Sequence, residues 1–194
     1  LLRKKMLLVG AGCVGASVAE ILVRSGVYNL TVVDSDIFEI GNLSRHVLNV
    51  GNIGELKELS LCSYLNSLNP HANIEVINDT LTIDEEFKTN ISLDKYDIII
   101  DCTGENSVLD VFQKADFRKS HIITSISVGL GAKHLYMTIM SGSTFYFNSF
   151  YKLISPYIQS ERDLFDDYNL PRNGIGCWHP TFPARSDDVW LAAA

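Results

Sequence analysis

Short apolar runs recur along the first two-thirds of the chain, between longer stretches whose apolar residues are spaced three and four apart. The short runs are typical of strands that are buried on both faces of a parallel sheet. The longer stretches are typical of amphipathic helices. The predicted strands are residues 5–9, 30–34, 73–78, 96–102 and 121–128, and the predicted helices are residues 16–25, 55–68 and 107–119.

This alternation predicts a Rossmann-like, doubly wound α/β sheet whose N-terminal part is parallel, with right-handed crossovers. Residues 132–140 and 144–147 are predicted to add antiparallel strands, and residues 84–94 to be partly helical. Prolines and glycines are frequent in the last third and favour irregular structure. We therefore expect one domain, residues 1–147, with residues 148–194 as its irregular C-terminal extension.

The composition excludes several classes of protein. The formal net charge of −7 argues against nucleic acid as the main partner, because such proteins carry a basic face. No apolar run approaches the roughly 18 residues of a membrane span. The four cysteines form no C-x-x-C pair, so neither a disulfide framework nor a zinc site is expected. The expected location is a reducing cytoplasm. The chain starts without Met and ends in three alanines, which suggests a fragment.

Three glycines at the end of the first predicted strand, Gly10, Gly12 and Gly15, have the G-x-G-x-x-G spacing and open a helix. The first permits a tight turn, the second lets the backbone approach a phosphate, and the third lets the helix pack on the strand. The helix N-terminus supplies N–H groups for an anion. This context predicts a bound nucleotide rather than a plain turn.

Asp34 ends the second predicted strand, where a carboxylate meets ribose hydroxyls in such folds. Asp36 lies nearby and no arginine lies in the immediate turn, so a 2′-phosphate would be repelled. The ligand is therefore predicted to be NAD or ATP, and not NADP.

Asn42, Arg45 and Lys57 favour ATP over NAD. A triphosphate carries more negative charge than a dinucleotide's pyrophosphate, and it needs added cations and usually Mg²⁺. Arginine offers a fork of donors and lysine a point charge. In combination with the glycine loop and Asp34, these residues predict a triphosphate site.

The segment D-S-D-I-F-E-I-G-N-L-S-R-H, residues 34–46, closely resembles ubiquitin-activating-type enzymes of the ThiF/MoeB/HesA group. The glycine loop, Lys57 and the pair Asn69-Pro70 also match, and the resemblance covers roughly residues 5–128. It implies an adenylyltransferase that uses ATP and Mg²⁺ to adenylate the C-terminal glycine of a small ubiquitin-like or sulfur-carrier protein. It also implies a homodimer.

By this resemblance, Asp34 would hold the ribose, and Asn42, Arg45 and Lys57 the phosphates. The last three would stabilise the charge that develops as pyrophosphate leaves. The sequence departs from the family at Gly104, where the family has an Asp associated with Mg²⁺. Asp101 or Glu105 is the candidate replacement, because a hard cation needs only a nearby oxygen.

The G-C-W-H-P segment around Cys177 has two readings. A thiolate there, with its pKa lowered by His179, would take the acyl group from AMP as a thioester. Alternatively, Cys177 is a buried structural cysteine beside Trp178. The other cysteines, Cys13, Cys62 and Cys102, are expected to be packing residues.

Two other functions stay open. A nicotinamide-dependent oxidoreductase would share the glycine loop and Asp34, but it does not explain Asn42, Arg45 and Lys57 together. A degenerate module would keep the fold and the nucleotide and lack the chemistry, and Gly104 favours it.

Overall fold

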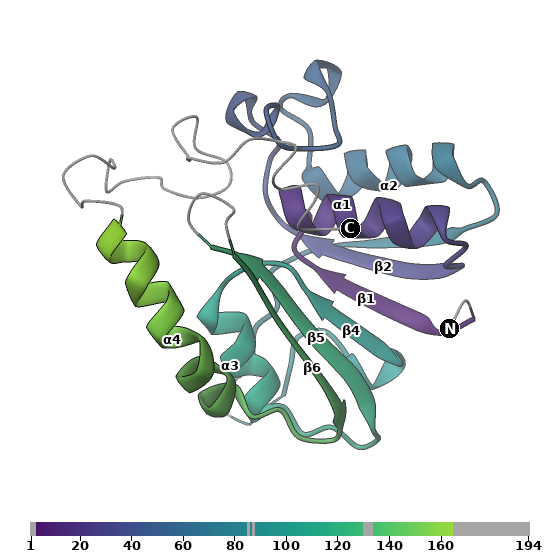
Figure 1. The fold of residues 1–194 in the computed structure, drawn as a ribbon. Helices are drawn as coiled ribbons and strands as arrows, with labels where there is room; N and C mark the ends of the chain where they lie inside the picture. The colour runs from purple at the N-terminus through teal and green to yellow at the C-terminus, as the bar shows by residue number, and fades with distance from the viewer. Residues whose placement is uncertain (1–2, 85, 87, 130–133, 165–194) are drawn as a thin grey trace.

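The computed structural model describes residues 3–84, 86, 88–129 and 134–164. Its strands form one sheet in the order β3-β2-β1-β4-β5-β6, in which the first five are parallel and β6 runs antiparallel to β5 (Figure 1). The strands are β1 (Lys5–Val9), β2 (Asn29–Asp34), β3 (Asn73–Asn78), β4 (Ile98–Asp101), β5 (His121–Val128) and β6 (Leu135–Gly142). The predicted Rossmann-like sheet is confirmed.

Helices cover both faces of this sheet. They are α1 (Cys13–Arg24), α2 (Lys57–Leu68), α3 (Asn106–Lys114) and α4 (Phe147–Leu164), with short 3₁₀ helices at Ile40–Asn42, Val50–Asn52 and Leu93–Lys95. Successive residues of a strand face opposite sides. Met6 and Leu8 of β1 accordingly join the core beneath α1 and α2, whereas Leu7 and Val9 join the core beneath α3 and α4 (Figure 1).

Three local predictions were wrong. Helix α1 begins at Cys13 rather than at residue 16, because Gly12 is its N-cap and the third glycine already lies inside the helix. Residues 144–147 are not a strand, since the antiparallel strand ends at Gly142 and α4 begins at Phe147. The described part of residues 84–94 contains no α-helix, only the start of the 3₁₀ turn Leu93–Lys95.

The expectation of irregular chain after residue 147 was also wrong as far as residue 164, because α4 occupies this stretch. Pro156 lies inside α4, and a proline usually interrupts a helix. Phe150, Ile154 and Ile158 lie four apart on the face that packs against the core, and this burial offsets the lost hydrogen bond. No helix in the described ranges is long and apolar enough to span a membrane.

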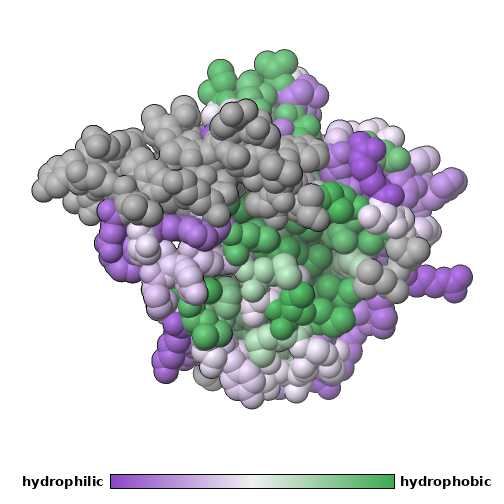
Figure 2. Space-filling model, viewed as in Figure 1, coloured by the Kyte–Doolittle hydropathy of each residue, from purple (hydrophilic) through white to green (hydrophobic). Residues whose placement is uncertain are grey.

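One face of the sheet is covered only in part. Figure 2 shows apolar side chains gathered at the surface over β5 and β6. Leu135, Met137 and Ile139 of β6 and Ile122 of β5 are exposed there. Helices α1 and α2 cover the part of this same face that β1 to β4 form, and no described helix extends their layer to β6.

Candidate nucleotide-binding site

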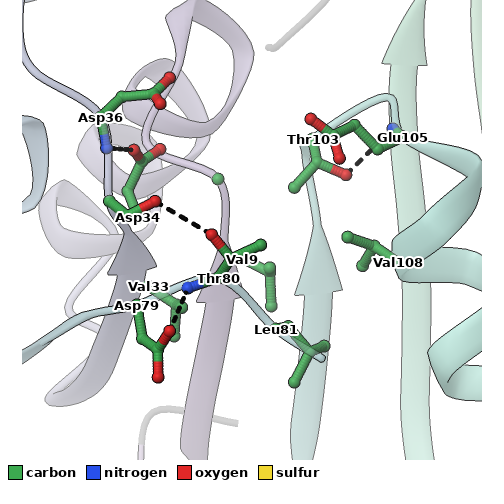
Figure 3. A pocket seen from close by; sticks show the side chains of 12 residues that line it. Val9, Val33, Asp34, Asp36, Asp79, Thr80, Leu81, Thr103, Glu105 and Val108 are labelled. Carbon is green, nitrogen blue, oxygen red and sulfur yellow. Dashed lines mark hydrogen bonds between the residues drawn. The ribbon is translucent and has the colours of Figure 1, made fainter. Parts of the chain in front are cut away.

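Two adjoining hollows lie at the carboxyl ends of β1, β2 and β4. They form one groove, because both are lined by Gly10, Asp34, Asp36, Thr103 and Glu105. Figure 3 shows Asp34 and Asp36 on one side of the opening, and Thr103 and Glu105 on the other. The strand order reverses between β1 and β4, and ligands of doubly wound sheets bind at this point of reversal.

The glycine loop joins β1 to α1 and each glycine has a different surrounding. Gly10 has a φ of +92° and donates its N–H to the Val33 carbonyl oxygen at 2.8 Å. A Cβ on Gly15 would lie 1.9 Å from the Gly10 carbonyl oxygen, so the helix packs on the turn without room for a side chain. A Cβ on Gly12 would meet nothing within 4 Å. Gly12 lines the groove, and it caps α1 with no side-chain hydrogen bond.

Asp34 is anchored by the backbone around it. Its Oδ2 accepts the Ala11 N–H at 2.6 Å, and its Oδ1 accepts the Asp36 N–H at 2.8 Å. Burial raises the pKa of Asp34, and these two N–H groups act in the opposite direction. A carboxylate can accept about four hydrogen bonds. Asp34 therefore retains capacity for ribose hydroxyls at the middle of the groove.

The three polar residues predicted to bind the phosphates, Asn42, Arg45 and Lys57, are all buried. Lys57 is 5% exposed, and its ammonium pairs with the Asp36 carboxylate at 2.9 Å. The Asn42 amide oxygen accepts the Glu39 N–H at 2.8 Å. Asn42 and Lys57 both line the groove beside Gly12. Arg45 is 3% exposed and lies next to this segment, but it is not among the residues that line the groove.

The two candidate carboxylates for Mg²⁺ have different surroundings. Asp101 is fully buried, and it accepts hydrogen bonds from the hydroxyls of Thr103 at 2.6 Å and Ser125 at 2.7 Å. Burial raises the pKa of Asp101. Glu105 is exposed and lines the groove. In the described ranges no three His, Cys, Asp or Glu side chains are grouped as metal ligands.

His46 lies against the glycine loop. Its Nδ1 accepts the Leu48 N–H at 3.2 Å, and its Nε2 lies 2.8 Å from the Ala11 carbonyl oxygen. A carbonyl oxygen only accepts, so Nε2 carries the hydrogen and the ring is neutral. The pKa of His46 is lowered to about 4, mainly by burial and to a smaller extent by the charge of nearby Lys57, while the bond to the Ala11 carbonyl acts in the opposite direction. The ring also packs edge-on against buried Phe38, with centroids 5.0 Å apart.

The other end of the groove contains an apolar slot beside the polar residues Ser35, Asp79 and Thr80. Val9 and Val33 at the strand ends, Leu81 after β3 and Val108 of α3 line it (Figure 3). The sequence indicated the strands but not that Leu81 and Val108 meet there. An apolar slot next to a carboxylate that can still accept hydrogen bonds is suited to a flat heterocyclic base.

The cysteines near the groove are buried. Cys13 and Cys102 both line it, and burial raises the pKa of Cys102 well above the usual value for a thiol. A protonated, buried thiol is a poor nucleophile, which agrees with the packing role predicted for Cys102. Cys177 and His179 lie outside the described residues.

An apolar slot, a central carboxylate and a glycine loop with buried polar side chains define a nucleotide-binding α/β domain. The ThiF family model matches residues 1–156, and the chain belongs to the ThiF family.

Two relatives and one solved structure show what the chain is similar to. It is 37% identical over 191 residues to the ATP-dependent ubiquitin transferase-like protein Cap2 of Enterobacter hormaechei, covering 98% of this chain and 31% of that protein. It is 33% identical over 142 residues to the adenylyltransferase and sulfurtransferase UBA4 of Candida albicans, covering 73% and 28%. The chain thus spans less than a third of the length of either relative. E. coli MccB, solved with MccA, shares the fold with a TM-score of 0.67 at 16% identity, over 100% of this chain and 53% of that one.

Proposed function

We propose that this chain is the adenylation domain of an enzyme that activates a small ubiquitin-like or sulfur-carrier protein. One observation carries the proposal: the open Gly12 position at the N-terminus of α1 lies in the same groove as Lys57 and Asn42. Asp34 stands between this polar end and the apolar slot, in the order phosphates, ribose and base of a nucleoside triphosphate. Cap2 is named ATP-dependent and UBA4 an adenylyltransferase, and neither is named an oxidoreductase.

The reaction needs no side-chain nucleophile. A carboxylate oxygen of the partner's C-terminus attacks the α-phosphorus of ATP, the bond to the β-phosphate oxygen breaks, and pyrophosphate leaves. The product is an acyl-adenylate. Negative charge grows on the departing pyrophosphate, and Lys57, Asn42 and Arg45 are the proposed groups that stabilise it. Mg²⁺ would neutralise phosphate oxygens, and Glu105, which is exposed and lines the groove, is the proposed carboxylate for it.

The proposed function extends to the domain bounds, the cellular location and the oligomeric state of the enzyme. Residues 1–147 are proposed as the adenylation domain and residues 148–194 as its extension, in a cytoplasmic protein. The enzyme would be a homodimer, which the exposed apolar residues over β5 and β6 support, because large apolar patches mark interaction surfaces.

ATP–pyrophosphate exchange tests the proposal, with the full chain and candidate small proteins encoded near its gene. Exchange should depend on the small partner, be lost in Arg45→Ala and survive in Cys177→Ala, because any thioester forms after adenylation. ATP binding without exchange under any condition would instead establish the degenerate module. A melting temperature raised by NAD and not by ATP-Mg²⁺ would exclude the proposed function.

A further inference from the structure

His46 connects two parts of the chain that are 35 residues apart in sequence. Its Nε2–H donates to the Ala11 carbonyl oxygen at 2.8 Å, in the middle of the glycine loop. Ala11 in turn donates its N–H to Asp34 at 2.6 Å. Hydrogen bonds therefore hold both sides of Ala11: its carbonyl oxygen is bound to the imidazole ring, which also accepts the Leu48 N–H, and its N–H is bound to the carboxylate of Asp34.

The bond to Ala11 fixes the direction of the next N–H. In a trans peptide the C=O and N–H of one unit point in opposite directions, and the described chain contains no cis peptide. With the Ala11 carbonyl held by His46, the Gly12 N–H points away from the histidine. Within the described residues this N–H donates no hydrogen bond to the protein, and Gly12 lines the groove.

We infer that His46 is a positioning residue for the nucleotide: by holding the Ala11 carbonyl oxygen, it aims the Gly12 N–H at a phosphate. The inference rests on the proposed function, since it needs ATP as the ligand. The surroundings of the ring fit this role. The ring is 8% exposed, so it is not a surface residue that ligands reach directly. Burial and the pairing of Nδ1 with the Leu48 N–H keep it neutral, with its hydrogen on Nε2.

Two substitutions separate this role from a merely structural one. The amide of His46→Asn ends near the place of Nδ1, so it retains an acceptor for the Leu48 N–H and does not reach Ala11. The amide of His46→Gln is one methylene longer, and its NH₂ can reach the Ala11 carbonyl oxygen. We expect His46→Asn to weaken ATP-Mg²⁺ binding roughly tenfold, the scale of one lost oriented hydrogen bond. His46→Gln should recover most of that affinity, to within about threefold of the wild type.

Isothermal titration of the full chain with ATP-Mg²⁺ at neutral pH measures these affinities, and thermal melting is recorded alongside. In ¹⁵N-glycine-labelled wild type, the Gly12 amide signal, assigned by its loss in Gly12→Ala, should shift when ATP-Mg²⁺ is added. A purely structural role would lower the melting temperature of His46→Asn and leave the affinity of the folded protein unchanged.

The outcomes are distinct. A folded His46→Asn protein that binds ATP as tightly as the wild type overturns the inference and leaves the proposed function intact. If His46→Asn does not fold, two results still decide. The inference is overturned if the Gly12 amide signal of the wild type does not shift when ATP-Mg²⁺ is added, or if a folded His46→Gln protein binds ATP-Mg²⁺ about ten times more weakly than the wild type. A Gly12 signal that shifts, together with a His46→Gln protein that retains its affinity for ATP-Mg²⁺, supports the inference. A wild type that binds no ATP at all refutes the proposed function itself.

Discussion

The neutral state of His46 makes the stability of this domain sensitive to mild acid. In the folded chain the ring is buried, and its pKa is lowered from 6.5 to about 4. In the unfolded chain the ring is exposed to water, so its pKa is higher and it takes up a proton more readily. His46 therefore contributes its full stability above pH 6.5, and this contribution is lost as the pH falls from 6.5 to about 4. The difference in proton affinity corresponds to about 3 kcal/mol of unfolding free energy.

Urea unfolding of the wild type and of His46→Gln between pH 7.5 and 4.5 measures this contribution. Other groups act in the opposite direction, because Asp34, Glu58 and Asp101 have raised pKa values and favour the folded state as they take up protons. They are present in both proteins, so the difference between the two curves isolates His46. The wild type should lose about 2 kcal/mol more than the variant over this range.

A matched substitution tests the reasoning. His71→Gln, which removes an exposed histidine, is the matched control substitution. The reasoning is refuted if the stability curves of the wild type and His46→Gln run parallel from pH 7.5 to 4.5. Parallel curves would mean that His46 takes up its proton in the folded chain as easily as in the unfolded one.

Further substitutions test the glycine loop, the phosphate site and the apolar face. Gly15→Ala should lower the unfolding free energy by about 3 kcal/mol or more, because its Cβ would overlap the Gly10 carbonyl oxygen. Gly12→Ala should cost at most about 1 kcal/mol in the same urea assay, yet weaken ATP binding measured by titration calorimetry. Lys57→Met should reduce ATP–pyrophosphate exchange at least a hundredfold, on the scale of other charge-stabilising groups (~10²–10³), and full exchange would exclude its catalytic role. Ile139→Glu should convert the proposed dimer to monomer in analytical ultracentrifugation, and an unchanged mass would place the interface elsewhere.

The parts of the fold that sequence predicted well are those fixed by local pattern. Residues 5–9, 73–78 and 121–128 match the observed strands β1, β3 and β5 residue for residue. Runs of apolar and β-branched residues bounded by polar ones define where a strand begins and ends. The prediction of irregular chain was wrong over residues 148–164 because Pro156 suggested a loop, whereas the apolar residues that hold α4 in place can be recognised only from the core against which they pack.

The site shows the same division. Gly10, Gly12, Asp34, Asn42 and Lys57 follow a spacing that the sequence displays, and all of them line the groove. His46 could not be found in this way, because its partner is a backbone carbonyl, and a carbonyl carries no side-chain signature. Leu81 and Val108 come from segments after different strands, and only the crossing of the chain brings them together.

The stretch from residue 35 to residue 57, which follows β2 and includes the first residue of α2, therefore has two tasks that cannot vary independently. It supplies Asn42 and Lys57 to the groove, and through His46 it also holds the loop that carries Gly12. A displacement of this segment would move the phosphate side chains and release the Ala11 carbonyl at once. Asp34 would then lose the fixed position of its partner, the Ala11 N–H.

Ribose and phosphate binding should thus weaken together when the segment is perturbed, whereas a change in the apolar slot, such as Leu81→Ala, should weaken the base contact alone. Comparing the binding of ATP with that of inorganic triphosphate separates the two cases. Leu81→Ala should spare triphosphate, and His46→Asn should weaken both ligands.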